Sequence, residues 1–322
     1  ENMAREAWSI AHPPGTALPS RNLDTVIVSY PKSGRTWLLC MLSQFLTNNT
    51  DSQSNSDVRM RSYRIRYHHG ENVFERALHP YRAKAAQVVQ KKADDYFRKR
   101  ACLPSRLFNA SSTLEDQSRV AAYGPKIIYL DRDVRDAIVS SYYERHLRGH
   151  LWRYQYAGNM SSFLREKYGS YDTLLWYHTA MREAVHKASK CASAGNRLLA
   201  LEYERLVACP MCALRDLCRF FSTKPLAWRV DGNIGFVDAS ICEDNERMEK
   251  TASRCSFTTL KNESKKGAGG GKWGNAIRGN ENSSKFRSGK VGGYKGELSA
   301  ADCQYVETAL LAHANALPEE EH

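Results

Sequence analysis

The amino-acid sequence predicts an α/β protein in which helices flank a central parallel β-sheet. Three short apolar runs, at residues 25–30, 126–130 and 197–201, have the length and composition of buried strands. Apolar residues at helical spacing follow each run. Because strands that alternate with helices form parallel sheets, these two observations favour a doubly wound arrangement. The 322 residues are enough for one large domain, and we expect a single domain over residues 1–322.

Each helix is predicted from the residues that follow its strand. After the first run, the apolar residues at helical spacing are Trp37, Leu38, Met41, Leu42 and Phe45. After the second run, the residues with this spacing are Ala137, Ile138, Ser141 and Tyr142. After the third run, a helix is expected from Cys212 to Phe221. Ligands of such sheets bind at the carboxyl ends of the strands, where the loops carry Lys32, Arg132 and Tyr203.

Two segments do not follow this alternation. Residues 77–119 are expected to form a helical insertion, because their first part is rich in Ala, Lys, Gln and Arg. Residues 263–290 contain so much Gly, Ser, Asn and Lys that we expect a mobile loop. This loop is either a plain linker or a lid over an anionic ligand.

The composition narrows the classes of partner. A net charge of +12 attracts anionic ligands. We expect no nucleic-acid partner, because no RNA- or DNA-binding motif accompanies the charge. We also expect no stable membrane insertion, because no apolar run is long enough for a membrane span.

The cysteines favour reduced thiols and a cytoplasmic location. The chain has 9 cysteines, an odd number, and is large enough to fold without disulfides. Cys209 and Cys212 have a spacing that zinc sites use, but no second pair of ligands stands nearby. We therefore expect two thiols at the start of a helix, and no metal site.

The stretch from Val26 to Leu42, VIVSYPKSGRTWLLCML, predicts a strand, a tight turn and a helix. Free backbone N–H groups and the helix dipole at such a turn form a cradle for phosphate. The spacing differs from the G-x-x-x-x-G-K-[ST] loop of nucleotide triphosphatases, because Lys32 precedes Gly34. The turn therefore predicts an anion site that is not a standard Walker loop.

The residues YPKSGRTW resemble the 5′-phosphosulfate loop, usually written YPKSGTTW, of sulfotransferases that use 3′-phosphoadenosine 5′-phosphosulfate (PAPS). Three further blocks follow in the order of that family's cytosolic-type, soluble branch: KIIYLDRDVRDAIVSSYY, LLALEYERL and FRSGKVGGYK. The blocks run from about Val26 to Lys295, so the resemblance covers nearly the whole chain. It implies a single P-loop-like domain and PAPS as co-substrate, with adenosine 3′,5′-bisphosphate (PAP) as product.

The resemblance also implies the residues that bind the donor. The loop residues that would hold its 5′ end are Lys32, Ser33, Gly34, Arg35, Thr36 and Trp37. The residues that would hold its 3′-phosphate are Arg132, Ser140, Arg287, Ser288 and Gly289, while Tyr203 would touch the adenine. The chain departs from the family pattern at Arg35, which replaces threonine. In the last block it also departs at Ser288, Gly293 and Tyr294, which replace lysine, aspartate and tryptophan.

The implied reaction is in-line transfer of the sulfo group of PAPS to a hydroxyl or amine, without a metal. Lys32 would stabilise the leaving phosphate, and a histidine would take the proton of the acceptor. The segment RIRYHHGEN supplies both His68 and His69. Adjacent residues of a strand face opposite ways, so only one of them can point into the site, and we favour His69. Other histidines, such as His146 and His178, are expected to be ordinary core or surface residues.

The acceptor is expected to be a small molecule, with a carbohydrate or a peptide as the alternative. The aromatic residues that either line its pocket or belong to the core are Tyr142, Tyr143, Trp152, Tyr154, Trp176 and Tyr177. We expect a monomer or a weak homodimer. The competing hypotheses are a kinase that uses ATP and magnesium, and a nucleotide-binding protein that has lost catalysis.

Overall fold

The structure is a computed structural model of the chain. It describes residues 25–30, 32–47, 65–68, 126–148, 156–165, 174–190, 197–222, 227–230, 233–236, 239–265, 284 and 286–315. The predicted insertion at residues 77–119 lies outside these ranges.

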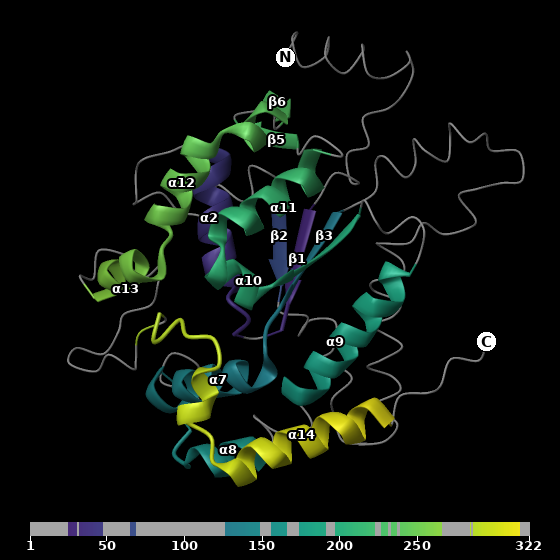
Figure 1. Ribbon diagram of the computed structural model, residues 1–322, viewed down its shortest axis with the longest axis vertical. Coiled ribbons are helices and arrows are strands. Elements are labelled where there is room, and N and C mark those ends of the chain that lie inside the picture. The colour runs from purple at the N-terminus through teal and green to yellow at the C-terminus, as the bar shows by residue number, and fades with distance from the viewer. Residues whose placement is uncertain are drawn as a thin grey trace, which may run out of the picture.

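A parallel sheet forms the centre of the described structure (Figure 1). Its strands are β1 (Thr25–Ser29), β2 (Ile65–His68), β3 (Lys126–Asp131) and β4 (Leu198–Glu202). They lie in the order β2-β1-β3-β4, and every neighbouring pair is parallel. The predicted fold class is confirmed, because the three apolar runs form three of these strands.

Helices follow the strands at the predicted places. The helix after β1 is α2 (Arg35–Thr47), and the helix after β3 is α7 (Val134–Arg148). After β4 the chain makes a short helix that was not predicted, α10 (Tyr203–Ala208), before the expected helix α11 (Pro210–Ser222). Proline is well suited to the first position of α11, because its fixed φ fits a helix and its missing N–H is not needed there.

The remaining described elements surround this core. They are α8 (Met160–Arg165), α9 (Leu174–Ser189), the hairpin β5 (Ala227–Val230) and β6 (Asn233–Phe236), η3 (Ala239–Glu243), α12 (Asn245–Arg254), α13 (Phe257–Lys265), η5 (Gly293–Gly296) and α14 (Ala300–Asn315). Among the described helices, none is long and apolar enough to cross a membrane.

The two faces of the sheet follow from the alternation of side chains along β3. Ile128 and Leu130 belong to the main hydrophobic cluster, which also contains residues of α2, α11 and α12. Asp131 points the other way and forms an ion pair with Arg182 of α9, with 3.1 Å from Nε to Oδ2. Helices therefore cover both faces, as a doubly wound sheet requires.

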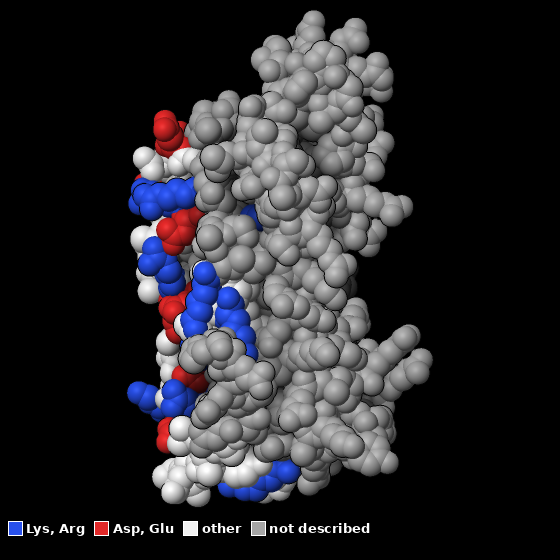
Figure 2. Space-filling view, turned by 90° about the vertical axis from the view of Figure 1, so that its right-hand side faces the viewer, with Lys and Arg blue, Asp and Glu red and all other residues white. Residues whose placement is uncertain are grey.

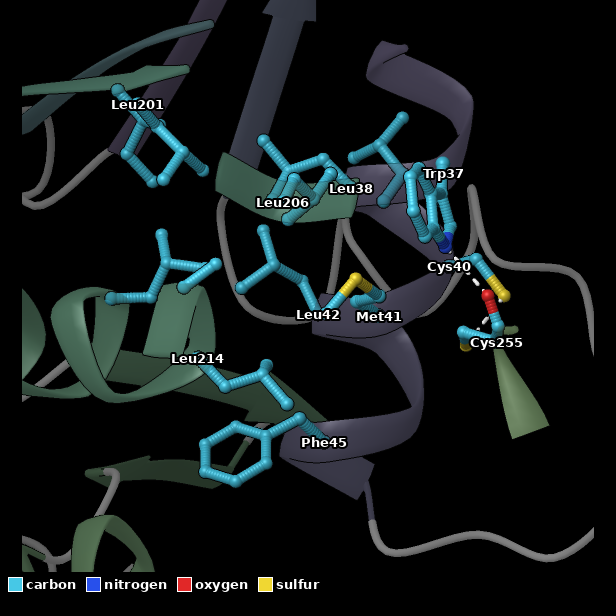
Figure 3. Packing of buried hydrophobic residues seen from close by; sticks show 14 of the residues in the cluster. Trp37, Leu38, Cys40, Met41, Leu42, Phe45, Leu201, Leu206, Leu214 and Cys255 are labelled. Atoms are coloured by element: carbon cyan, nitrogen blue, oxygen red, sulfur yellow. Dashed lines mark hydrogen bonds between the residues drawn. The ribbon is translucent and has the colours of Figure 1, made fainter. Parts of the chain in front are cut away.

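Helix α2 lies in the middle of the main cluster (Figure 3). Leu38, Met41 and Leu42 have no exposed surface, because the sheet packs on one side of α2 while α11 and α12 pack on others. A helix that is apolar on most sides must be buried in this way. The burial fixes α2, and with it the turn that precedes the helix.

The ends of the predicted mobile loop are part of the packed structure. Helix α13 extends to Lys265, and Ser284 and Phe286 are both buried. Residues 266–283 lie outside the described part of the chain. Averaged composition over residues 263–290 does not reveal these ends, because a few packed residues are outnumbered by Gly and Lys.

The prediction of free thiols at Cys209 and Cys212 is wrong. The two residues form a disulfide, with their Cα atoms 5.2 Å apart, although they do lie at the start of a helix as expected. The first turn of α11 brings the side chains together, since Cα separations of this size suit a disulfide. Counting cysteines could not detect this, because the pairing depends on local geometry. In the described ranges, no group of His, Cys, Asp and Glu could hold a metal ion.

The burial of α2 gives a stability prediction. Leu38→Ala should lower the free energy of unfolding by about 3 kcal/mol, because it removes a fully buried side chain and leaves a cavity in the cluster. The measurement is urea-induced unfolding followed by circular dichroism. Leu311→Ala on α14 is the control, since Leu311 is 65% exposed and should change stability by less than about 0.5 kcal/mol. Equal effects of the two variants would contradict the packing described here.

Candidate functional site

The turn between β1 and α2 has an unusual backbone. Lys32 has φ 69°, and Gly34 has φ 89°, both in the left-handed region. The Ser33 hydroxyl is buried and donates to the Tyr30 carbonyl at 3.0 Å, which holds the turn against the strand. Helix α2 then begins at Arg35, and the Gly34 carbonyl accepts its first hydrogen bonds, from the N–H groups of Trp37 and Leu38. The N-terminus of a buried helix therefore opens at the carboxyl end of β1, which is an arrangement that favours anions.

Arg132 joins this turn to the neighbouring strand. It follows β3, and its Nη1 donates to the Lys32 carbonyl at 2.8 Å. Its guanidinium lies over the Tyr203 ring, 4.2 Å from the ring centre. The Nε atom is buried and has no hydrogen-bond partner among the described residues. A buried cationic donor without a partner is costly, so this atom indicates a place for an anionic acceptor.

Tyr203 packs directly on the glycine of the turn. A Cβ atom at Gly34 would lie 2.5 Å from Tyr203 Cδ2, so no larger residue fits without displacement of the ring. Trp37 meets the same ring edge to face, with 5.8 Å between the ring centres. Burial raises the pKa of Tyr203, so its hydroxyl stays protonated at neutral pH. The structure thus brings Gly34, Trp37, Arg132 and Tyr203 together.

Trp37 is held from the far side by α12 and the residues after it. Its Nε1 donates to the Cys255 carbonyl at 2.5 Å, and the Cys255 sulfur lies 2.8 Å from Cys40 Sγ (Figure 3). Because the indole N–H is already bonded to protein, Trp37 can offer a ligand only its ring. This is compatible with stacking on a base.

The C-terminal block lies against the start of α13. Gly289 has φ 64°, and a Cβ there would lie 2.5 Å from the Phe257 ring. Phe257 also meets Phe286 edge to face at 6.1 Å. Phe257 was not identified from the sequence, because no motif marks it. Its position two residues after Cys255 becomes informative only when the hydrogen bond of Trp37 to the Cys255 carbonyl is known.

A second residue that the sequence did not reveal, Asp136, ties this block to α7. Its carboxylate is buried and accepts from the Gly292 N–H at 2.8 Å and from the Tyr294 N–H at 2.9 Å. Asp136 lies in the first turn of α7, just after Arg132. The two segments predicted to hold the 3′-phosphate are therefore joined by charge-assisted hydrogen bonds.

Two cations of the site are paired with carboxylates. Lys32 Nζ contacts Glu144 of α7, one helical turn beyond Ser140. Arg287 Nη1 contacts Glu297 at 2.9 Å and lies over the Tyr143 ring, 4.2 Å from its centre. An anionic ligand that binds either cation must compete with these carboxylates.

Glu297 is itself held in place by Tyr143, whose hydroxyl donates to it at 2.8 Å. Burial and this bond raise the pKa of Tyr143, so the phenol remains a donor at neutral pH. The Tyr143 hydroxyl therefore fixes the carboxylate that orients Arg287.

The remaining predicted residues are placed as follows. Arg35, Thr36, Ser140 and Ser288 are each half-buried, the first two in the first turn of α2. His68 is the last residue of β2 and pairs with Val28 of β1. The structure describes its backbone but not its side chain, and His69 lies outside the described residues. Strand β2 therefore ends beside the turn that carries Lys32.

Two of the aromatic candidates for the acceptor pocket, Tyr142 and Tyr143, are half-buried and pack against a second hydrophobic cluster. Tyr142 packs with Tyr156 and Phe163 in this cluster, and its hydroxyl donates to the Gly158 carbonyl at 3.3 Å. Tyr143 is engaged with Glu297. Trp152 and Tyr154 lie outside the described residues, as do the side chains of Trp176 and Tyr177.

A polar group lies behind the turn, on the α9 side of the sheet. His178 is buried against Tyr30, with 5.0 Å between ring centres, and its Nε2 is 3.7 Å from Asp131. Burial lowers the pKa of His178 to about 3 and raises that of Asp131 to about 6. His178 is therefore neutral at pH 7 and has the core role predicted for it.

The residues fit the donor that the sequence implies. The unpartnered Arg132 Nε, the N-terminus of α2 and the glycine contact with Tyr203 surround the turn that carries Lys32. A nucleotide with phosphates at two positions needs several cations, and Lys32, Arg132 and Arg287 are the cations predicted for this role. This chemistry suits PAP and PAPS.

The contact between Gly34 and Tyr203 generates a prediction. Gly34→Ala should weaken binding of PAP at least tenfold and cost about 2 kcal/mol of stability, because the added Cβ displaces the Tyr203 ring and the residue keeps a positive φ. Calorimetric titration and thermal unfolding measure the two effects. The control is Gly296→Ala, whose Cβ would meet nothing within 4 Å. Unchanged PAP affinity in Gly34→Ala would show that this contact does not shape the site.

Comparisons with known proteins agree with this geometry. A protein-family model described as a sulfotransferase domain matches residues 22–314. Cytosolic sulfotransferase 16 of Arabidopsis thaliana is 26% identical over 314 residues, which cover 92% of this chain and 80% of that protein. Cytosolic sulfotransferase 17 of Arabidopsis thaliana is 27% identical over 286 residues, which cover 87% and 71% of the two chains.

Among solved structures, a retinol dehydratase in complex with androsterone and the inactive cofactor PAP aligns with a TM-score of 0.52 and 16% identity. The alignment covers 94% of this chain and 83% of that one, and at this identity it shows the likeness of fold. Together with the match over residues 22–314, which spans most of the sequence, these observations establish that the chain belongs to the sulfotransferase family.

Proposed function

We propose that the protein transfers the sulfo group of PAPS to a hydroxyl or amine of a small-molecule acceptor, in the cytosol. The observation that carries this proposal concerns Arg132. Its Nη1 donates to the Lys32 carbonyl, while its buried Nε has no partner among the described residues and is available to an anion. Membership of the sulfotransferase family supports the reaction class. The names of the Arabidopsis relatives support the cytosolic location.

In this proposal the residues of the turn stabilise negative charge. PAPS supplies the sulfo group and leaves as PAP. Lys32 Nζ neutralises the charge that develops on the departing phosphate, and the N–H groups of the first turn of α2 add fixed dipoles. Their positions are set in advance by the buried helix α2, so little reorganisation is needed during the reaction.

The proposed general base is His69, with His68 as the alternative. Strand β2 pairs with β1 in parallel, so both strands end on the side of the sheet where Lys32 stands. A histidine at this edge is suited to remove the acceptor's proton, because neutral imidazole accepts a proton near pH 7.

The acceptor is proposed to be a small organic molecule. The retinol dehydratase structure with a similar fold contains androsterone, which supports a pocket of that size. A carbohydrate or peptide acceptor remains the alternative. Where the described residues reach the surface in Figure 2, acidic and basic side chains are interspersed.

The test of this function compares two nucleotides and then measures transfer. PAP should raise the melting temperature of the protein by several degrees, whereas ATP with magnesium should not. Transfer of labelled sulfo groups from PAPS to a panel of phenols, steroids, amines, sugars and tyrosine peptides then identifies the acceptor. Stabilisation by ATP with magnesium and none by PAP would refute the proposal in favour of a kinase. Binding of PAP without transfer to any acceptor would favour a protein that has lost catalysis.

Single alanine variants separate the roles of the residues in the same assay. Lys32→Ala and His69→Ala should each lower kcat by at least about 100-fold, because each removes charge stabilisation or proton transfer. His68→Ala should keep most of the activity. A dead His68→Ala together with an active His69→Ala would assign the base to His68 instead.

The contact between Lys32 and Glu144 leads to a further prediction. Glu144→Gln should tighten PAP binding roughly fivefold, because the variant removes a carboxylate that competes with the anion for Lys32, and ion pairs that water reaches contribute up to about 1 kcal/mol. Titration calorimetry at low salt measures the effect, which should shrink as salt is added. Glu307→Gln is the control, since Glu307 is exposed and lies near Arg135. Weaker PAP binding in Glu144→Gln would mean that Glu144 orients Lys32 and does not compete for it.

A further inference from the structure

Cys209 and Cys212 form a disulfide at the corner between α10 and α11. Cys209 lies between the end of α10 at Ala208 and the start of α11 at Pro210. The pair takes no part in the proposed sulfo transfer. Cys209 is nevertheless the residue that follows α10, and α10 begins with Tyr203, whose ring packs on Gly34 in the turn between β1 and α2.

The Cys209 sulfur occupies the position of a helix cap. The Cys212 N–H, in the first turn of α11, points to Cys209 Sγ at 3.2 Å. The Cys209 carbonyl accepts the first helical bond, from the Ala213 N–H at 3.1 Å. An anion at an N-cap is stabilised by these free N–H groups and by the helix dipole. In the reduced protein this geometry favours the thiolate form of Cys209, the form that reacts with disulfides.

The pair is also accessible. Cys209 and Cys212 are both half-buried, so part of each residue meets solvent. By contrast, Cys40, Cys218 and Cys255 are buried, and Cys40 and Cys255 lie deep in the main cluster (Figure 3). A thiol in solution can therefore reach the bonded pair more readily than it can reach these three thiols.

Contacts other than the disulfide also hold the corner between α10 and α11. Arg205 of α10 forms an ion pair with Asp216 of α11, with 2.7 Å from Nη2 to Oδ2 and 2.8 Å from Nε. The Cys209 N–H also donates to the Arg205 carbonyl at 2.9 Å. A disulfide that closes so short a loop restricts the unfolded chain less than one that closes a long loop. Stability is thus a weak reason for the bond.

We propose that Cys209 and Cys212 are a reversible thiol–disulfide exchange site, with Cys209 as the nucleophile. In the oxidising direction, the Cys209 thiolate attacks a low-molecular-weight disulfide such as oxidised glutathione, and one glutathione thiolate leaves. Cys212 then loses its proton and attacks Cys209 Sγ, which releases the second glutathione thiolate. The protein loses two electrons and two protons, and one glutathione disulfide becomes two thiols. Reduction follows the same steps in reverse.

The first experiment follows the pair in the folded, full-length protein at defined ratios of reduced to oxidised glutathione. Acid quenching, alkylation and peptide mass spectrometry give the fraction bonded at each ratio. We expect one reversible two-electron transition, reached from both the oxidised and the reduced side. A pair that stays bonded in excess dithiothreitol, or that never bonds at any ratio, would refute the proposal.

The second experiment identifies the nucleophile by trapping. In the Cys212→Ser variant, oxidised glutathione should form a mixed disulfide with Cys209. This reaction should be at least about tenfold faster than formation of the mixed disulfide with Cys212 in the Cys209→Ser variant. Cys303→Ser is the control, because Cys303 is a free, half-buried thiol of α14, and its exchange at Cys209 and Cys212 should match that of the unmodified chain. Equal trapping rates would refute the assignment to Cys209. Circular dichroism confirms that each variant is folded, and none of these readouts depends on sulfo transfer.

Discussion

The arrangement of side chains at the carboxyl ends of β1, β3 and β4 depends on the close contact between the Gly34 backbone and the Tyr203 ring. This contact exists because Gly34 has no Cβ and adopts a positive φ, so that an aromatic side chain from β4's end can lie directly on the turn after β1. The ring in turn supports the Arg132 guanidinium, which bonds to the Lys32 carbonyl. Three separate strands are thus joined at their carboxyl ends through one glycine.

The cationic residues of this site are positioned by carboxylates. Asp136 joins the start of α7 to the C-terminal block by two backbone hydrogen bonds, which brings the segments of Arg132 and Arg287 into one structure. Lys32 and Arg287 each contact a carboxylate, which limits the repulsion between cations before an anion binds. A site arranged in this way favours a ligand that brings several negative charges at once, because only such a ligand outweighs the resident carboxylates.

Much of the fold could be predicted from the sequence, because buried parallel strands and α2 leave strong apolar patterns. The strand, turn and helix around Lys32 could also be predicted, since the order of Pro31, Lys32 and Gly34 and the blocks around Arg132 and Tyr203 are local in sequence. Asp136, Glu144 and Phe257 could not be predicted, because their roles depend on contacts between distant segments. The same reason explains the disulfide of Cys209 and Cys212, which counting cysteines could not reveal.

The central claim is that the site recognises a nucleotide by its 3′-phosphate. Calorimetric titration of the protein with PAP and with adenosine 5′-monophosphate tests this directly, because the two ligands differ only in that group. If Arg132 and Arg287 bind the 3′-phosphate as proposed, two charge-assisted contacts should make PAP bind roughly 100-fold more tightly, a difference of about 3 kcal/mol. Equal affinities for the two nucleotides would contradict the account.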